Sequence, residues 1–193
     1  FWEKGWWEAE APARGEEYTQ FADFAADPEE HPLDTPSGKV ELFSETIASF
    51  RYDDAPGHPV WIEPREWLGA KQAERFPLHL LSYQPATRLH GQLDPGRVAA
   101  GDKIAGREPI MLNAEDAAAR GLKPGDIVRV FNERGACLGG LRTDPGLMRG
   151  VAMMATGAWF DPLEPGVPGS LCVHGNPNEL TPDVVTSRLW QES

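Results

Sequence analysis

The side chains best suited to binding a ligand follow a short apolar run near the middle of the chain. Residues 78–81 have the length and character of a buried strand, and Pro85 interrupts the pattern soon afterwards. The segment beyond carries six polar side chains, which are Ser82, Gln84, Thr87, Arg88, His90 and Gln92. Several hydrogen-bond donors leaving the end of one buried strand can hold a polyanionic or heterocyclic ligand. A polar surface loop after a core strand explains the same pattern equally well.

Two further turns carry residue types that suit a flat, polar ligand. Gly157 and Gly175, like Gly91 in the first segment, lack a Cβ and would let the main chain approach a ring closely. His174 and Asn176 flank Gly175 and add donors and acceptors. The alternatives stay open, because His174 and His90 can equally serve structural roles, Asn176 opens a plain turn, and Trp159 after Ala158 is typical of a core residue.

Patterns for self-contained chemistry are absent from the sequence. Cys137 and Cys172 are the only cysteines, and their spacing predicts two buried thiols rather than a zinc site or a disulfide framework. No His pair or Cys cluster has metal-ligand spacing, and no Gly-x-Gly-x-x-Gly opens a helix. Catalytic and metal-ligating residues are therefore not predicted in this chain.

Composition and charge limit the partners. The chain has 193 residues, 40% of them hydrophobic, and a net charge of −12. Residues 1–34 hold ten acids against two bases, which leaves only −4 on the other 159 residues. Without a basic face, nucleic-acid binding is not expected, and no apolar run approaches the ~20 residues of a membrane span. The sequence does not distinguish a cytoplasmic from a periplasmic protein.

The order of elements predicts three segments. Residues 1–34 form an acidic, Trp-rich stretch continuing from an upstream domain, with Trp2, Trp6 and Trp7 packing on that missing partner. Residues 35–77 hold a turn, a strand at 39–43, a short helix that Ser44 caps, and an extended Pro-rich connection pinned by Trp61 and Trp67. Residues 78–193 form the domain proper.

Within residues 78–193 the pattern predicts short strands at 78–81, 109–112, 127–131, 136–142 and 151–154, with Met153 and Met154 in the core. Asn113 caps a helix at 114–120, Asp116 completes its capping box, and Gly121 ends it. Short strands with frequent turns predict a mainly β protein with short helices, a six-stranded double-psi β-barrel with an extended N-terminal arm.

Six stretches in the same order resemble the C-terminal, cofactor-binding domain of the dimethyl sulfoxide reductase family of molybdenum enzymes. They are residues 35–50, 78–94, 106–109, 113–130, 155–162 and 172–178. The resemblance is strongest to the branch that reduces biotin sulfoxide, trimethylamine N-oxide and dimethyl sulfoxide. It implies an enzyme only as part of a larger polypeptide, whose upstream domains would be this chain's partners and whose substrate would be a small S-oxide or N-oxide.

The resemblance further implies a bis(molybdopterin guanine dinucleotide) molybdenum cofactor whose metal ligand lies outside this chain. The implied cofactor-binding residues are Ser82, Gln84, Arg88, His90, Gln92, Gly157, Ala158, His174, Gly175, Asn176, Ser187, Arg188 and Gln191. Arg88 offers a planar guanidinium for a pyrophosphate. Two alternatives remain: the same domain in another molybdopterin enzyme, such as a formate dehydrogenase, or a β-barrel binding or assembly module without a cofactor.

Overall fold

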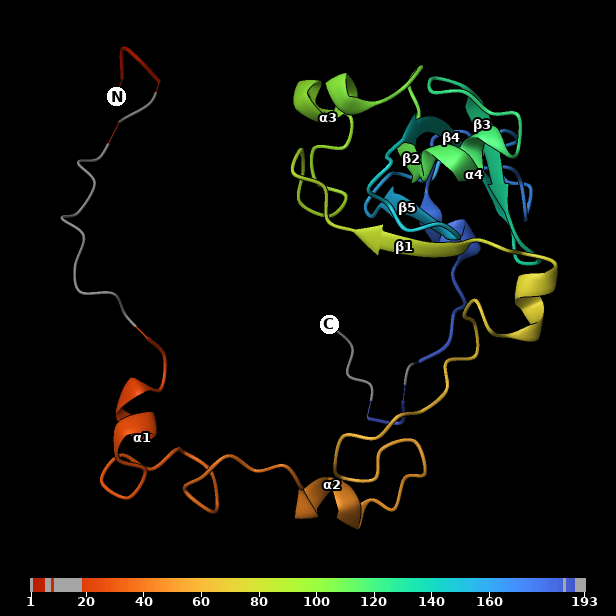
Figure 1. Ribbon diagram of the computed structural model, residues 1–193. Coiled ribbons are helices and arrows are strands. Elements are labelled where there is room, and N and C mark those ends of the chain that lie inside the picture. Colours follow the sequence, from red (N-terminus) through yellow and green to blue (C-terminus); the bar gives the residue numbers. More distant parts are fainter. Residues whose placement is uncertain (1, 6–7, 9–18, 186, 190–193) are drawn as a thin grey trace. The chain divides into compact units, whose positions relative to one another are not determined.

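The computed structural model describes residues 2–5, 8, 19–185 and 187–189. The chain divides into two compact units, one comprising residues 1–62 with 186–193 and the other residues 63–185 (Figure 1). The sequence predicts three segments, with boundaries after residues 34 and 77. These segments are not the same as the two compact units, and the three-segment division stays a prediction. Trp6 and Trp7 lie outside the described residues, whereas Trp2 is 96% exposed.

The first unit contains two short helices, α1 (Ala22–Ala26) and α2 (Glu45–Ser49), and neither has a buried residue. The predicted cap of α2 is confirmed, because Ser44 Oγ accepts the backbone N–H of Ile47 at 3.3 Å. The predicted strand at 39–43 is wrong. Thr35 Oγ1 donates to the Lys39 carbonyl at 2.7 Å, so side-chain bonds hold this backbone in a turn instead of a ladder.

The second unit is built on a five-stranded sheet in the order β1-β5-β2-β4-β3 (Figure 1). The strands are β1 (His79–Tyr83), β2 (Pro109–Leu112), β3 (Ile127–Phe131), β4 (Ala136–Thr143) and β5 (Val151–Ala155). β1 runs parallel to β5 and β2 parallel to β4, while the β2–β5 and β3–β4 pairs are antiparallel. The mixed sheet is not closed into a barrel, so the mainly β class is confirmed and the six-stranded barrel is not.

Short helices accompany these strands: η1 (Lys71–Glu74) precedes β1, α3 (Arg97–Asp102) lies between β1 and β2, α4 (Ala114–Ala118) lies between β2 and β3, and η2 (Pro177–Leu180) follows β5. The Asn113 cap is confirmed, because its side chain accepts the Glu115 N–H at 2.8 Å, and Gly121 after the helix has the left-handed φ of 68°. Asp116 does not complete a capping box. Its carboxylate accepts the Gly150 N–H at 2.6 Å instead, which ties α4 to the turn before β5.

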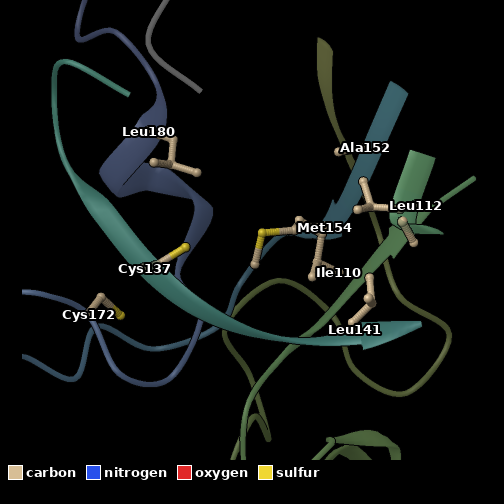
Figure 2. Close-up of a cluster of buried hydrophobic side chains, with 9 residues drawn as sticks. Ile110, Leu112, Cys137, Leu141, Ala152, Met154, Cys172 and Leu180 are labelled. Atoms are coloured by element: carbon tan, nitrogen blue, oxygen red, sulfur yellow. The ribbon is translucent and has the colours of Figure 1, made fainter. Parts of the chain in front are cut away.

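The core lies where β2, β4 and β5 meet (Figure 2). Leu141, Met154, Cys137 and Cys172 are fully buried, which confirms the predicted buried thiols and the core position of Met154. Cys172 forms isolated bridges with Cys137 and Pro162, so the segment after β5 extends the sheet beside β4 without forming a strand. Burial raises the pKa of the Cys137 thiol to about 12, so this sulfur stays protonated at neutral pH.

The predicted anchoring of residues 51–77 by tryptophans is not observed, because Trp61 is 78% exposed and Trp67 is 39% exposed. In the part of the chain that the structure describes, no helix has the length and apolar character needed to cross a bilayer.

Replacing Leu141 by Ala is expected to lower the free energy of unfolding by about 2–5 kcal/mol, because the change opens a cavity in the packed core. Leu163→Ala serves as the matched control, since Leu163 is 61% exposed and its loss should cost less than about 0.5 kcal/mol. Hydrogen exchange of the β2 and β4 amides in the protein that carries this chain measures both. Equal effects of the two substitutions would contradict the described core.

Candidate functional site

A cluster of four buried charges lies in the loops that follow β1 and α3. Arg88, Asp94, Lys103 and Glu108 form it, and each of these side chains is at most 5% exposed. Lys103 Nζ donates to Asp94 Oδ1 at 2.7 Å and to Glu108 Oε2 at 2.9 Å. An Arg88 guanidinium N–H donates to Glu108 Oε1 at 3.1 Å. Two positive and two negative groups cancel, so this charge cluster can be buried without a net charge.

The charge cluster also joins segments that are distant in the sequence. Arg88 donates a second hydrogen bond to the carbonyl of Thr156 at 2.6 Å. Asp94 Oδ2 accepts the backbone N–H of Trp159 at 3.0 Å and lies 2.7 Å from His174 Nε2. Three of the predicted site segments, those around residues 88, 157 and 174, are therefore held together through buried side chains.

Asp94 is ionised through most of the pH range. Burial alone would raise the pKa of this carboxyl group, but hydrogen bonds from Lys103, from the Trp159 N–H and from His174 outweigh it. Together they lower the pKa of Asp94 from 3.8 to about 2. At neutral pH its two oxygens act only as acceptors.

The turn at Gly157 packs closely against the first segment. Gly157 has a φ of 81°, and a Cβ there would collide with the carbonyl of His90. The indole N–H of Trp159 donates to the carbonyl of Gly91 at 2.7 Å. Trp159 is 55% exposed, so its predicted core position is wrong, and Ala158 beside it is buried instead. The glycine is required here for contact between two backbones.

The turn at residues 174–176 meets the start of β2. The backbone N–H of Glu108 donates to the His174 carbonyl at 2.9 Å. Gly175 has a φ of 103°, and a Cβ added there would lie 2.7 Å from the Cβ of Glu108. Asn176 Oδ1 accepts the Asn178 N–H at 2.9 Å and so caps η2. The close approach fixes the position of His174 relative to the charge cluster.

Three of the predicted site residues remain available to a ligand. Ser82, His90 and Gln92 are exposed, and their side chains make no hydrogen bond to any residue that the structure describes. Gln84 is exposed as well, but its Nε2 donates to the Arg88 carbonyl at 2.9 Å. Ser82 lies in β1, whereas Gln84, His90 and Gln92 lie on the loop after it, which also carries Arg88 and Asp94 of the charge cluster.

Two predicted site residues, Ser187 and Arg188, belong to the other unit. There the Arg188 guanidinium pairs with Asp53 at 3.0 Å, and the backbone N–H of Arg188 donates to Asp54 Oδ2 at 3.0 Å. Gln191 lies outside the described residues. A cavity of about 490 Å³ lies between β1 and β3, and of the predicted residues only Ser82 lines it.

The sequence interpretation missed Asp94, Lys103 and Glu108, and it gave Arg88 a different task. The predicted contact of Arg88 with a pyrophosphate stays a prediction, but its guanidinium is 1% exposed and is engaged by Glu108 and Thr156. One signal was present in the sequence. Glu108 stands directly before the apolar run of β2, where an acid is costly to bury without a partner.

The unit is a mainly β domain in which buried charges tie polar loops together. Residues 78–190 match the family described as the Molydopterin dinucleotide binding domain. The chain belongs to this family.

The curated relatives are reductases of N-oxides and S-oxides by name. The chain is 43% identical to the dimethyl sulfoxide/trimethylamine N-oxide reductase of Cereibacter sphaeroides, with 99% of this chain and 23% of the relative covered. It is 47% identical to trimethylamine-N-oxide reductase 1 of Escherichia coli K12 (87% and 20% covered). Identity to the biotin sulfoxide reductase of Cereibacter sphaeroides is 44% (99% and 25% covered).

A solved structure supports the fold. The acetylene hydratase of Pelobacter acetylenicus superposes with a TM-score of 0.62 at 24% identity, covering 82% of this chain and 22% of that one. The chain thus spans between a fifth and a quarter of the length of these relatives.

Acid should weaken the charge cluster through Asp94. Because the folded-state pKa lies below the ordinary value of 3.8, the ionised carboxylate stabilises the folded state above about pH 4, and this contribution is lost as the pH falls towards 2. The difference in unfolding free energy between the native sequence and Asp94→Asn should shrink by about 2 kcal/mol over that range. Urea-dependent proteolysis within residues 84–108 measures it. A difference that stays constant from pH 7 to pH 2 would contradict the assignment.

Replacing Gly175 by Ala should separate the turn at residues 174–176 from β2. The new Cβ overlaps Glu108, and the left-handed backbone adds about 1 kcal/mol of strain. Gly106→Ala is the matched control, since its φ of +76° carries similar strain while nothing lies within 4 Å of its added Cβ. We expect the thermal midpoint to fall further for Gly175→Ala than for Gly106→Ala. Equal shifts would show that the close approach to Glu108 is unimportant.

Proposed function

We propose that this chain is the dinucleotide-binding part of a molybdenum oxidoreductase that reduces S-oxides or N-oxides. The cofactor would be bis(molybdopterin guanine dinucleotide) molybdenum, with the protein ligand to the metal in another part of the polypeptide. Family membership supports the cofactor class, and the names of the curated relatives support the substrate class. They favour an oxide reductase over a formate dehydrogenase or a cofactor-free binding module.

One structural observation carries the proposal. Exposed hydrogen-bonding side chains, Ser82 in β1 and Gln92 in the loop after it, lie on a segment that buried charges connect to the turns at residues 157 and 174. A pterin or guanine edge requires several neutral hydrogen-bonding groups in fixed positions, and Ser82, Gln92 and the amide of Asn176 are of that kind. The donor set therefore fits the heterocycles of the cofactor.

The fit is different for the phosphates. The Arg88 guanidinium already faces Glu108 and Asp94, so binding a pyrophosphate would require it to leave a buried ion pair. Arg88 instead holds the loop in place through its hydrogen bonds to Glu108 and to the Thr156 carbonyl. When bound, the molybdenum centre supplies the oxygen-atom chemistry, and this chain's residues bind and orient the cofactor.

The finer fold belongs to the same proposal. The sheet would close into a six-stranded double-psi barrel, with the segment around Cys172 as the sixth strand. Its bridges to Cys137 and Pro162 support this, as do the two parallel pairs β1–β5 and β2–β4. Partners would be the other domains of the polypeptide and a small oxide substrate.

Gln92→Ala in the protein that carries this chain should lower its molybdenum and guanine content several-fold and leave the thermal midpoint of the cofactor-free protein unchanged. The side chain is exposed and makes no hydrogen bond within the described residues, so the fold does not depend on it. Metal analysis and chromatography of released nucleotide give the two contents. Gln72→Ala, an exposed glutamine of η1, is the control and should change neither. Unchanged content in Gln92→Ala would remove Gln92 from the site, and a native protein without guanine dinucleotide would refute the proposed function.

A further inference from the structure

Asp94 stands out within the charge cluster because it receives three different donors on its two oxygens. Lys103 Nζ lies 2.7 Å from Oδ1, while the Trp159 N–H and His174 Nε2 lie 3.0 and 2.7 Å from Oδ2. The Asp94 side chain is 1% exposed, whereas His174 is 20% exposed. Glu108, the other acid, bonds only to Arg88 and Lys103 through its carboxylate. Asp94 alone therefore links the buried charges to a side chain that reaches solvent.

The contact fixes which ring nitrogen of His174 carries hydrogen. Lys103 and the Trp159 backbone can only donate to Asp94, and the ionised carboxylate has no proton to give. The hydrogen between Asp94 and His174 must therefore belong to Nε2. Nδ1 is the nitrogen that remains free to hydrogen-bond to another molecule. It has no partner among the residues that the structure describes.

The contacts of His174 restrict the orientation of its imidazole ring. Its Nε2 is held by Asp94, its carbonyl accepts the Glu108 N–H, and Gly175 behind it tolerates no Cβ. Arg88 and Lys103, the other charged groups of the cluster, reach the ring only through the two carboxylates. The ring is thus fixed on one side and open on the other.

We propose that Asp94 is a positioning residue of the site, which holds His174 in the Nε2–H form so that Nδ1 faces the bound cofactor. The inference rests on the function proposed above and assigns a part to a residue that does not itself touch the ligand. Asp94 simultaneously fixes the backbone of Trp159, so one carboxylate would align two contact segments, those at residues 157–159 and 174.

Two substitutions of His174 separate its nitrogens. His174→Asn keeps a polar atom near the place of Nδ1 and loses the contact with Asp94, whereas His174→Gln keeps a donor near the place of Nε2 and loses Nδ1. Asp94→Asn cannot accept from Lys103, Trp159 and His174 together, because its amide nitrogen is a donor. Glu108→Gln is the matched control, since it disturbs the same charge cluster without touching the His174 ring.

The experiment measures molybdenum and guanine content, thermal midpoint and amide exchange at residues 157–159 in the protein that carries this chain. We expect Asp94→Asn to lower cofactor content about tenfold and to speed the exchange of the Trp159 amide. Glu108→Gln should lower the thermal midpoint with a much smaller loss of cofactor. In a His174→Gln background, Asp94→Asn should cause a smaller further loss than in the native background, because only its contact with the Trp159 N–H remains to be lost.

Several outcomes overturn the proposal. Equal cofactor loss in Asp94→Asn and Glu108→Gln would mean that Asp94 serves stability alone. Independent, multiplying losses for Asp94 and His174 would also contradict it. If Asp94→Asn fails to fold, the His174→Gln single variant still tests the proposal. A native protein with no guanine dinucleotide would refute the proposed function and this inference together. If the native protein contains the cofactor and the His174→Gln variant keeps the full cofactor content, only the inference is refuted, and the proposed function stands.

Discussion

The burial of two carboxylates is the constraint on which the rest of the site depends. Asp94 and Glu108 are each 1% exposed, and an unpaired buried acid would cost several kcal/mol. Arg88 and Lys103 compensate them, and each base must then come from a segment that folds back onto the sheet. The loop after β1, the stretch between α3 and β2 and the turns near residues 157 and 174 are consequently locked in one arrangement. The large apolar side chains of these loops, Leu89, Leu93, Trp159 and Phe160, are exposed, so packing alone would not hold the loops.

A division of labour follows from that arrangement. The four charged side chains are buried and pair with one another, with Arg88 Nε lacking a hydrogen bond among the described residues. The groups exposed beside them are a hydroxyl, two amides and an imidazole, those of Ser82, Gln84, Gln92 and His90. Such groups discriminate by geometry, because a hydrogen bond to a fixed neutral donor is lost when the ligand edge does not match. Rigid support beneath a neutral surface is what a domain needs if it must select a heterocycle.

Local signals explain why much of the sheet could be predicted and why the site could not. The strands at 109–112 and 127–131 have the predicted bounds, since apolar and β-branched runs flanked by turns specify them locally. The caps by Ser44 and Asn113 also depend on neighbours only. The partners of the charge cluster, by contrast, are far apart in the sequence, up to 80 residues for Asp94 and His174. The hydrophobic periodicity of a sequence carries no information about pairings between such distant residues. The backbone of Trp159 is likewise bound by the distant Asp94.

The net charge of the whole chain does not represent the charge at the candidate site. A chain with a net charge of −12 would repel an anionic dinucleotide if long-range attraction between charges decided binding. Residues 1–34 account for −8 of that charge, and the buried cluster of Arg88, Lys103, Asp94 and Glu108 contributes none. The other 159 residues therefore carry −4, and in the proposed binding mode N–H and amide dipoles, rather than the buried Arg88 and Lys103, contact the ligand. Binding by dipoles is less sensitive to salt than binding by exposed arginines, because screening acts on whole charges at a distance.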